Sequence, residues 1–267
     1  MAYRLVVTDL DGTARSRRFG ITPGVRRAIA DARAIGVRVC VATGRMWQSA
    51  APWVRSLGAD APAILYNGGL LLDFDSGRAL YERRLAAESA RQALTVIRSD
   101  PEVQPHLFLN DHVYVERRHA MSEAYAEEDG LEYRVVTAFE PLLTGDPHKI
   151  LVLGTSGRLE ALGLAARQAA LPARAVQSEP TKLEFLPPGV SKGRALRAMI
   201  EALGVEAGEV IAVGDNWNDL EMIEAAGLGV AMANAPEEVR ARADHVCGTA
   251  DEEGLRDVLE RFVLARP

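Results

Sequence analysis

Cysteine, lysine and long apolar segments are all scarce in this chain of 267 residues. The two cysteines, Cys40 and Cys247, cannot build a disulfide framework, so we expect both to be small buried residues in a reducing compartment. Uncharged stretches such as residues 61–72 stop well short of the ~18 residues that a membrane-spanning helix needs. The apolar run at residues 5–7 meets Asp9 almost at once, which is unlike a signal peptide. We therefore expect a soluble, cytoplasmic protein with no membrane partner.

Basic residues are also fewer than acidic residues. The chain has 31 basic and 37 acidic residues, a net charge of −6, so it offers no cationic surface that would attract nucleic acid. Among the basic residues only Lys149, Lys182 and Lys192 are lysines, and such a rare lysine hints at a place that needs a compact point charge. Hydrophobic residues make up 48% of the chain, which is enough to fill a core and excludes global disorder.

Two signals of other protein classes are missing. No Gly-x-Gly-x-x-Gly sequence follows an apolar run, so the chain lacks the fingerprint of a dinucleotide-binding fold. The five histidines show no spacing typical of metal ligands. We expect the histidines at the surface or in hydrogen-bonded positions.

The first part of the chain alternates between apolar runs and a helical pattern. Residues 5–8, 37–42 and 63–66 are continuous apolar runs, as expected for strands buried on both faces. Thr22-Pro23 is a helix start signal, and residues 25–35 follow with helical periodicity. This order predicts a parallel sheet with helices on both faces.

The middle of the chain has a different pattern. Residues 112–116 alternate polar and apolar, as in a half-exposed antiparallel strand, and Asn110-Asp111 before them predicts a hairpin turn. Pro187-Pro188-Gly189 indicates a linker, after which buried strands and helices return. We therefore predict an α/β fold with a parallel-sheet core of residues 1–81 and 189–267, interrupted by a smaller α/β domain of residues 82–188.

Polar residues cluster where the apolar strands end. Four segments share this position: Asp9-Leu10-Asp11-Gly12-Thr13, Thr43-Gly44-Arg45, Asn67-Gly68-Gly69 and Gly214-Asp215-Asn216-Trp217-Asn218-Asp219. Ligands of open α/β sheets bind outside the carboxyl ends of the strands, so we expect these side chains to line one crevice.

Several carboxylates in one crevice require a cation, because like charges at a few ångströms raise one another's pKa steeply. Mg²⁺ suits a site with few carboxylates, several waters and a substrate phosphate. Thr43 and Lys192 add a hydroxyl group and a positive charge for phosphate oxygens. This combination matches the needs of phosphoryl transfer, in which catalysis is mostly positioning and charge neutralisation.

The same segments resemble the four motifs of the haloacid dehalogenase superfamily: Asp9-x-Asp11-Gly12-Thr13, Thr43-Gly44-Arg45, Ser191-Lys192-Gly193 and Gly214-Asp215-Asn216-x-Asn218-Asp219. Their order and spacing are similar to those of the Cof-type phosphatases, and the resemblance covers the whole chain. It implies a Rossmann-like core and, at residues 82–188, a cap domain that selects the substrate. The implied reaction is Mg²⁺-dependent hydrolysis of phosphomonoesters of small metabolites, with sugar phosphates favoured.

The resemblance also implies roles for the aspartates. Asp9 is the expected nucleophile and forms an aspartyl-phosphate, while Asp11 acts first as general acid and then as general base. The expected metal ligands are Asp9, the main chain of Asp11, Asp215 and, through water, Asp219. Further residues are expected to bind the phosphate (Thr43, Gly44, Lys192 and Asn218) or to lie near the substrate (Arg45, Asn67 and Gly68).

One departure from the family pattern is Ala14, which is followed by Arg15-Ser16-Arg17-Arg18. We expect these arginines in a solvated loop, the alternative being that they assist an anionic substrate. Two other functions stay open: a phosphomutase with the same aspartyl-phosphate, and a non-enzymatic regulatory domain that accepts a phosphoryl group. A dehalogenase is disfavoured because that chemistry has no use for Asp11 as an acid. The expected partner is a small phosphorylated metabolite, and the expected oligomeric state is a monomer or homodimer.

Overall fold

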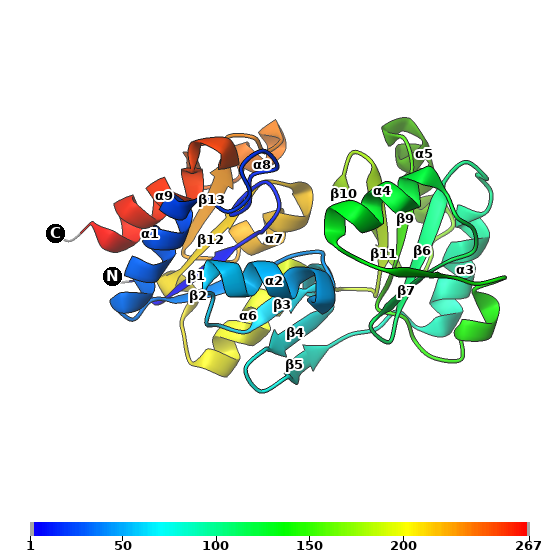
Figure 1. The fold of residues 1–267 in the computed structure, drawn as a ribbon, viewed down its shortest axis with the longest axis horizontal. Helices are drawn as coiled ribbons and strands as arrows, with labels where there is room; N and C mark the ends of the chain where they lie inside the picture. The colour runs from blue at the N-terminus through cyan, green and yellow to red at the C-terminus, as the bar shows by residue number, and fades with distance from the viewer. Residues whose placement is uncertain (1–2, 266–267) are drawn as a thin grey trace. The chain divides into compact units, whose positions relative to one another are not determined.

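The structure, a computed structural model, describes residues 3–265 and divides into two compact units (Figure 1). The first unit comprises the chain up to Arg45, Ala50–Glu82 and the chain from Ser191 on. The second unit comprises Met46–Ser49 and Arg83–Val190. In the part of the chain that is described, no helix is both long enough and apolar enough to cross a bilayer.

The central sheet of the first unit has the strand order β14-β13-β12-β1-β2, and each neighbouring pair is parallel. The bounds are β1 Leu5–Thr8, β2 Arg38–Val41, β12 Val210–Gly214, β13 Leu228–Met232 and β14 His245–Cys247. Every residue of β1 and β12 is buried, which explains their uninterrupted apolar sequences. The predicted α/β fold with a parallel-sheet core is confirmed.

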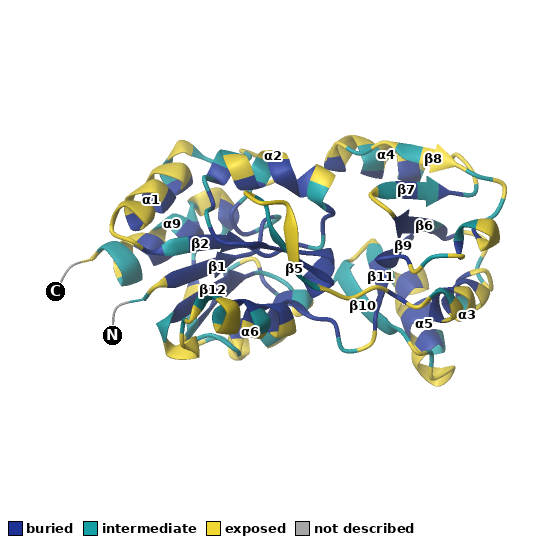
Figure 2. Ribbon diagram, turned by 90° about the horizontal axis from the view of Figure 1, so that it is seen from below, coloured by how far each residue is buried: buried dark blue, intermediate teal, exposed yellow. Residues whose placement is uncertain are grey.

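Helices cover both faces of this sheet. Figure 2 shows α1 (Pro23–Ala34) and α9 (Gly254–Leu259) on one side of the strands and α6 (Lys192–Leu203) on the other. The predicted start of α1 is confirmed, since the Thr22 hydroxyl accepts a hydrogen bond from the backbone N–H of Val25 and proline occupies the first turn. Further α-helices of this unit include α7 Leu220–Ile223 and α8 Glu237–Ala241.

The third predicted strand differs from expectation. β3 (Ala63–Leu65) contacts the parallel sheet through a single bridge between Ala42 and Ile64. It pairs along its length with the antiparallel strand β4 (Leu70–Asp73), which pairs in turn with β5 (Arg78–Glu82). The chain reverses at the tight 3₁₀ turn of residues 66–68, so its next strand returns along β3 instead of crossing over the sheet.

The second unit is built on a mixed sheet with the strand order β10-β11-β9-β6-β7-β8. The bounds are β6 Gln104–Leu109, β7 His112–Val115, β8 Tyr133–Val135, β9 Lys149–Leu153, β10 Arg174–Glu179 and β11 Lys182–Leu186. Helices α3 (Ala87–Ile97) and α5 (Ser156–Gln168) pack on one face and share its apolar core. The predicted hairpin between β6 and β7 is confirmed, with Asn110 and Asp111 both at positive φ.

Several helical segments are short or irregular. Residues 217–223 form a 3₁₀ turn (Trp217–Asp219) followed by the short α7, and α9 continues as a π-helical turn (Glu260–Leu264). Two other helices have sequences that do not suggest a helix. α2 (Trp47–Leu57) has Pro52 in its interior, and α4 (Ala120–Asp129) combines few apolar residues with many acidic ones.

Candidate active site

The site forms where β1 and β12 end. These strands are parallel neighbours in register from Leu5–Val210 to Thr8–Val213, so the residues after them emerge together. Asp9 follows β1, and its backbone N–H donates to the carbonyl of Val213 at 2.9 Å. One carboxylate oxygen each from Asp9, Asp215 and Asp219 lie within 4.8 Å of one another.

Asp219 is held by its own loop. Its Oδ2 accepts hydrogen bonds from the backbone N–H groups of Asp215 and Asn216, both at 3.0 Å. Its Oδ1 accepts from Lys192 Nζ at 2.6 Å, and the side chain is fully buried. Gly214 makes this tight loop sterically feasible, because a Cβ at that position would lie 2.4 Å from the Cβ of Asp219. Both oxygens of Asp219 are therefore engaged by the protein itself.

Lys192 links the two strand ends. Its Nζ donates to Asp9 Oδ1 as well as to Asp219 Oδ1, each at 2.6 Å, and the residue is completely buried as the first residue of α6. Burial lowers the pKa of Lys192, but the charges of Asp219 and Asp9 outweigh burial and raise it above its usual value. The ammonium group is therefore charged at neutral pH.

The carboxylates carry more negative charge than Lys192 can neutralise. Burial raises the pKa of Asp9 well above its usual value, and the charges of Asp219 and Asp215 add to this effect against that of Lys192. Burial, together with the charge of Asp219, raises the pKa of Asp215 to about 7. Buried carboxylates in this state favour a further cation, and oxygen donors of this spacing fit a hard divalent ion.

Asp215 is oriented toward the cluster from both sides. Its Oδ1 accepts from the hydroxyl of Thr13 at 2.9 Å, and its Oδ2 accepts from Asn234 Nδ2 at 3.1 Å. Gly12 allows the close approach, since it has a φ of +87° and a Cβ there would lie 2.4 Å from Asp215 Oδ2. No role was predicted for Thr13 or Asn234 from the sequence. Asn234 could have been noticed because it follows strand β13 as the other site residues follow theirs.

The carboxylate of Asp11 lies outside this cluster and faces two arginines. Arg45 donates from Nε to Oδ2 at 2.6 Å and from Nη2 to Oδ1 at 3.0 Å, while Arg15 donates from Nη1 to Oδ1 at 2.6 Å. Burial alone raises the pKa of Asp11, but the hydrogen bonds and charges of Arg45 and Arg15 outweigh it and lower the pKa below its usual value. Asp11 is therefore ionised in this conformation.

The prediction of a solvated loop is wrong for part of the segment Arg15-Ser16-Arg17-Arg18. Arg17 and Arg18 are exposed, as predicted, whereas Ser16 is buried. Only 15% of the Arg15 side chain is exposed, because it turns inward to Asp11. Its guanidinium carbon also lies 4.5 Å from the centre of the Trp53 ring, a cation–π contact.

The residues expected near the phosphate come from adjoining turns. The buried Thr43 hydroxyl accepts from the backbone N–H of Arg45 at 3.1 Å, and the N–H of Asn67 donates to the Thr43 carbonyl at 3.0 Å. Gly44 lies between Thr43 and Arg45 in this turn. Asn218 donates from Nδ2 to Asn67 Oδ1 at 2.9 Å. Asn67 Nδ2 and Asn218 Oδ1 are then buried without a hydrogen-bond partner in residues 3–265.

Backbone strain is concentrated at the turn that carries Asn67. Tyr66, Asn67 and Gly68 all have positive φ values, of 52°, 55° and 98°. Gly68 is required by packing as well, because a Cβ would lie 2.2 Å from the carbonyl oxygen of Ser191. Ser191 caps α6 by accepting from the N–H of Arg194, so Gly68 brings the Asn67 turn directly against the start of the helix that carries Lys192.

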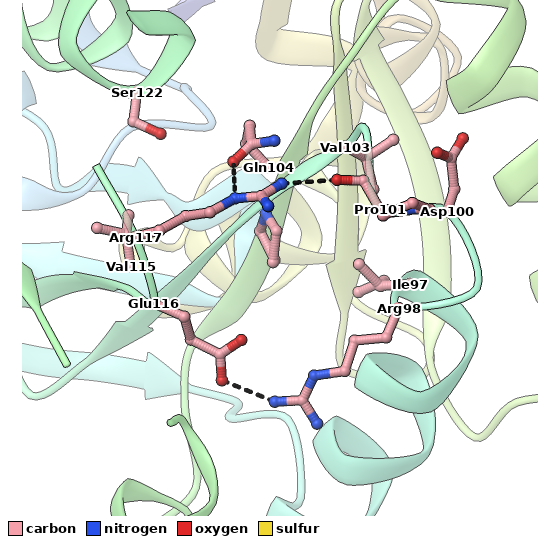
Figure 3. A pocket seen from close by; sticks show the side chains of 11 residues that line it. Ile97, Arg98, Asp100, Pro101, Val103, Gln104, Val115, Glu116, Arg117 and Ser122 are labelled. Carbon is pink, nitrogen blue, oxygen red and sulfur yellow. Dashed lines mark hydrogen bonds and ion pairs between the residues drawn. The ribbon is translucent and has the colours of Figure 1, made fainter. Parts of the chain in front are cut away.

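A pocket of about 300 Å³ lies within the second unit, where α3 ends and β6 begins (Figure 3). Its charged side chains are paired with protein groups. Arg98 donates to Glu116 at 2.7 Å, and Arg117 donates to Gln104 Oε1 at 3.1 Å and to the Pro101 carbonyl at 2.6 Å. Because these charged side chains already pair with protein groups, the pocket does not indicate which ligand it would bind.

Comparison with known proteins identifies the family of the chain. The model of a family described as haloacid dehalogenase-like hydrolase matches residues 6–259. Pyridoxal phosphate phosphatase YbhA of Escherichia coli is 28% identical, with 99% of each chain covered. The 5-amino-6-(5-phospho-D-ribitylamino)uracil phosphatase YcsE of Bacillus subtilis is 29% identical over 98% of this chain and 96% of its own.

The fold has solved counterparts over nearly the whole chain. The X-ray structure of TM0651 from Thermotoga maritima covers 97% of each chain with a TM-score of 0.82 and 32% sequence identity. With a family match that spans almost the entire sequence, the chain belongs to the haloacid dehalogenase-like hydrolases, in their Cof-type phosphatase branch.

Proposed function

We propose that this hydrolase is a Mg²⁺-dependent phosphatase that cleaves phosphomonoesters of small metabolites, sugar phosphates among them, through an aspartyl-phosphate on Asp9. The observation that carries the proposal is the position of Asp9, whose carboxylate adjoins both the ammonium group of Lys192 and the carboxylate of Asp215. The names of the Escherichia coli and Bacillus subtilis relatives, which each specify a small phosphorylated compound, support the substrate class.

Asp9 is the nucleophile in this proposal. Lys192 fixes Asp9 Oδ1, so the other carboxylate oxygen attacks phosphorus. A bond forms between this oxygen and phosphorus while the ester P–O bond breaks, which leaves an aspartyl-phosphate and an alkoxide. Covalent catalysis of this kind divides one difficult displacement into two easier ones.

Asp11 donates a proton in one half of the proposed reaction and accepts a proton in the other. In the first half, protonated Asp11 gives its proton to the departing alkoxide. In the second half, its carboxylate accepts a proton from the water that attacks phosphorus and releases Asp9. The second half needs an ionised Asp11, and the hydrogen bonds from Arg45 and Arg15 favour that form.

The residues that would hold Mg²⁺ are Asp9, Asp215 and the main chain of Asp11. Asp219 is the fourth predicted member, and because its oxygens are engaged by Lys192 and by backbone N–H groups, it would act through water and by shaping the loop. When bound, the ion supplies positive charge for the developing negative charge on the phosphoryl oxygens. Thr13 and Asn234 keep the Asp215 carboxylate turned toward the cluster.

The phosphate itself is assigned to Thr43, Gly44, Lys192 and Asn218, with Arg45, Asn67 and Gly68 beside the substrate. The unpartnered buried atoms Asn67 Nδ2 and Asn218 Oδ1 support a polar ligand at this point, because a bound substrate would satisfy them. We further propose that the second unit, residues 82–188, acts as a cap that selects the substrate and excludes water.

We also propose a location and an oligomeric state for the protein. A reducing cytoplasm suits the chain because both cysteines are free and buried, at Cys40 and Cys247. We expect a monomer or a homodimer.

Phosphate release from p-nitrophenyl phosphate tests the proposed function. Asp9→Asn should abolish turnover in a protein that still folds cooperatively, whereas Asp75→Asn, at an exposed loop position, should leave turnover unchanged. Normal activity of the Asp9 variant would exclude the covalent mechanism. Steady release of phosphate from a monophosphate without a bisphosphate activator would exclude the phosphomutase alternative.

A further inference from the structure

Two asparagines from distant parts of the chain form a hydrogen-bonded pair of carboxamides at the candidate active site. Asn67 lies on the turn after β3, and Asn218 lies on the 3₁₀ turn after β12. Asn218 donates from Nδ2 to Asn67 Oδ1 at 2.9 Å. The backbone N–H of Asn67 donates to the Thr43 carbonyl, and Asn218 precedes Asp219, which pairs with Lys192. The pair therefore adjoins the segments that carry Thr43 and Lys192, both assigned to the substrate phosphate.

This pair leaves one donor and one acceptor without a partner. Asn67 Nδ2 and Asn218 Oδ1 are buried, and neither has a hydrogen-bond partner within residues 3–265. Turning both carboxamides over would exchange their oxygen and nitrogen atoms, but it would again leave one donor and one acceptor. Buried polar groups normally have partners, so the pair calls for a ligand that both donates and accepts a hydrogen bond.

The backbone that carries Asn67 is strained. Tyr66 and Asn67 have φ values of 52° and 55°, a region that residues other than glycine seldom occupy. Gly68 then packs the turn closely against the carbonyl of Ser191. Strain of this kind persists where the surrounding structure imposes it, and it is concentrated at sites that bind ligands. The strained turn therefore supports a binding role for the Asn67 carboxamide.

The chemistry of the two free groups selects among ligands. The oxygens of an ionised phosphate only accept hydrogen bonds, so they suit Asn67 Nδ2 and repel Asn218 Oδ1. An ammonium group suits Asn218 Oδ1 but has no lone pair for Asn67 Nδ2. A hydroxyl group satisfies both, because its oxygen accepts one hydrogen bond while its hydrogen is donated in the other.

We propose that Asn67 and Asn218 determine substrate specificity by binding a hydroxyl group on the carbon next to the phosphate-bearing carbon of the substrate. The inference rests on the proposed function and narrows its substrate class to phosphomonoesters with such a neighbouring hydroxyl group. The hydroxyl group is placed there because Thr43 and Lys192 hold the phosphate beside the pair. Asn218 Nδ2 carries a second hydrogen, which stays available to the phosphate.

Three alkyl phosphates that differ in one hydroxyl group provide the test. 2-Hydroxypropyl phosphate has the hydroxyl group at the proposed position, 3-hydroxypropyl phosphate has it one carbon further away, and propyl phosphate lacks it. The wild type should hydrolyse 2-hydroxypropyl phosphate with a kcat/KM at least about tenfold above the other two values, because a site built to bind a hydroxyl group rejects an analogue without it. If either of the other compounds is hydrolysed equally well, the proposal is overturned.

Two variants show whether the asparagine pair is the source of this preference. Asn67→Gly removes the carboxamide but suits the positive φ of the turn, so the protein should still fold. In this variant and in Asn218→Ala, the preference should fall to about twofold or less, since neither variant keeps both hydrogen bonds to the hydroxyl group. A tenfold preference that survives in Asn67→Gly would also overturn the proposal.

Asn110→Gly is the matched control. Asn110 is an exposed asparagine with a φ of 49° in the hairpin between β6 and β7, so the same replacement there should leave the preference unchanged. The unfolding temperature of each variant shows whether it is folded.

Failure of this inference differs from failure of the proposed function. If the wild type hydrolyses the three alkyl phosphates equally well while Asp9→Asn hydrolyses none, the asparagine pair does not bind a substrate hydroxyl group and the proposed function stands. If the wild type releases phosphate neither from these compounds nor from p-nitrophenyl phosphate, the proposed function fails, and the role of Asn67 and Asn218 fails with it.

Discussion

Lys192 and Asp219 form an ion pair of 2.6 Å in which neither side chain has any exposed surface. The same ammonium group lies 2.6 Å from Asp9, which follows a strand at the opposite end of the sequence. Lys192 therefore joins the start of α6, the loop after β12 and the end of β1. Losing one partner of a buried ion pair leaves an uncompensated charge, which typically costs about 3–5 kcal/mol.

Replacing Lys192 with methionine should impair both stability and catalysis. Asp9 and Asp219 would remain buried without their cation, so we expect the free energy of unfolding at pH 7 to fall by about 3–5 kcal/mol. Turnover should fall below detection because Asp9 loses the group that orients it. Urea denaturation without added metal measures the first effect, and phosphate release measures the second. Arg194→Gln, an exposed change in the same helix, should alter stability by less than about 0.5 kcal/mol. A fully stable Lys192 variant would contradict this account of the site.

Removal of the metal should silence the enzyme reversibly. We expect a chelator to stop phosphate release and Mg²⁺ to restore it. A ligand that binds only the folded state adds about 2.7 kcal/mol at one hundred times its Kd, so Mg²⁺ should also raise the unfolding temperature. Asp215→Asn should lose most of this thermal stabilisation, because Asp215 is oriented toward the cluster by Thr13 and Asn234. Equal stabilisation of the wild type and of Asp215→Asn would place the ion elsewhere.

The turn at Gly68 should tolerate no side chain. Gly68 and Gly20 both have positive φ, but a Cβ at Gly20 meets nothing within 4 Å, whereas at Gly68 it lies 2.2 Å from a backbone oxygen. Alanine at either position carries the cost of a left-handed backbone, and at Gly68 the clash adds about 2 kcal/mol. Gly68→Ala should also lower turnover by shifting Asn67 and the start of α6. Urea denaturation of both variants gives the comparison, and equal losses of stability would exclude the steric explanation.

The sequence predicted those features that depend on neighbours along the chain. The start of α1 at Thr22-Pro23 and the hairpin at Asn110-Asp111 are local choices of backbone conformation, and both were predicted correctly. The buried strands β1 and β12 were recognisable because a strand covered on both faces needs an apolar side chain at every position. The polar residues that follow these strands could therefore be assigned to one end of the sheet from the sequence alone.

Features that depend on distant contacts were missed. Arg15 is in a run that looks solvated, and it turns inward only because α2 presents Trp53 beside it. α2 itself was hidden by Pro52, which tertiary packing tolerates inside the helix. The departure of β3 from the parallel sheet depends on the strained turn at Asn67, and that strain is supported by contacts with Ser191 far along the chain.

The interior of the second unit contains His106, a histidine that was predicted to lie at the surface or in a hydrogen-bonded position. His106 is completely buried, and its Nδ1 lies 3.0 Å from the carbonyl of Gln104. Its Nε2 has no partner within residues 3–265, so the expectation is only half right. Tyr125 packs against the ring edge to face, with centres 5.6 Å apart.

Burial is the main cause that lowers the pKa of His106 from 6.5 to about 4, because the charged ring would lose its hydration. Between pH 4 and pH 6.5 the ring of His106 therefore stays neutral in the folded state, whereas it is protonated in the unfolded state. The stability that depends on neutral His106 is complete above pH 6.5 and is lost as the pH falls toward 4. By pH 4 the loss is about 3 kcal/mol.

Replacing His106 with glutamine should therefore make the protein less sensitive to acid. The variant loses packing at all pH values, but the difference in unfolding free energy between wild type and variant should shrink by about 3 kcal/mol between pH 7.5 and pH 4. Urea denaturation across this range measures the difference. His112→Gln, at a half-buried ring on the neighbouring strand, is the matched control and should keep the acid sensitivity of the wild type. Parallel pH profiles for the wild type and His106→Gln would show that the neutral ring has no part in acid unfolding.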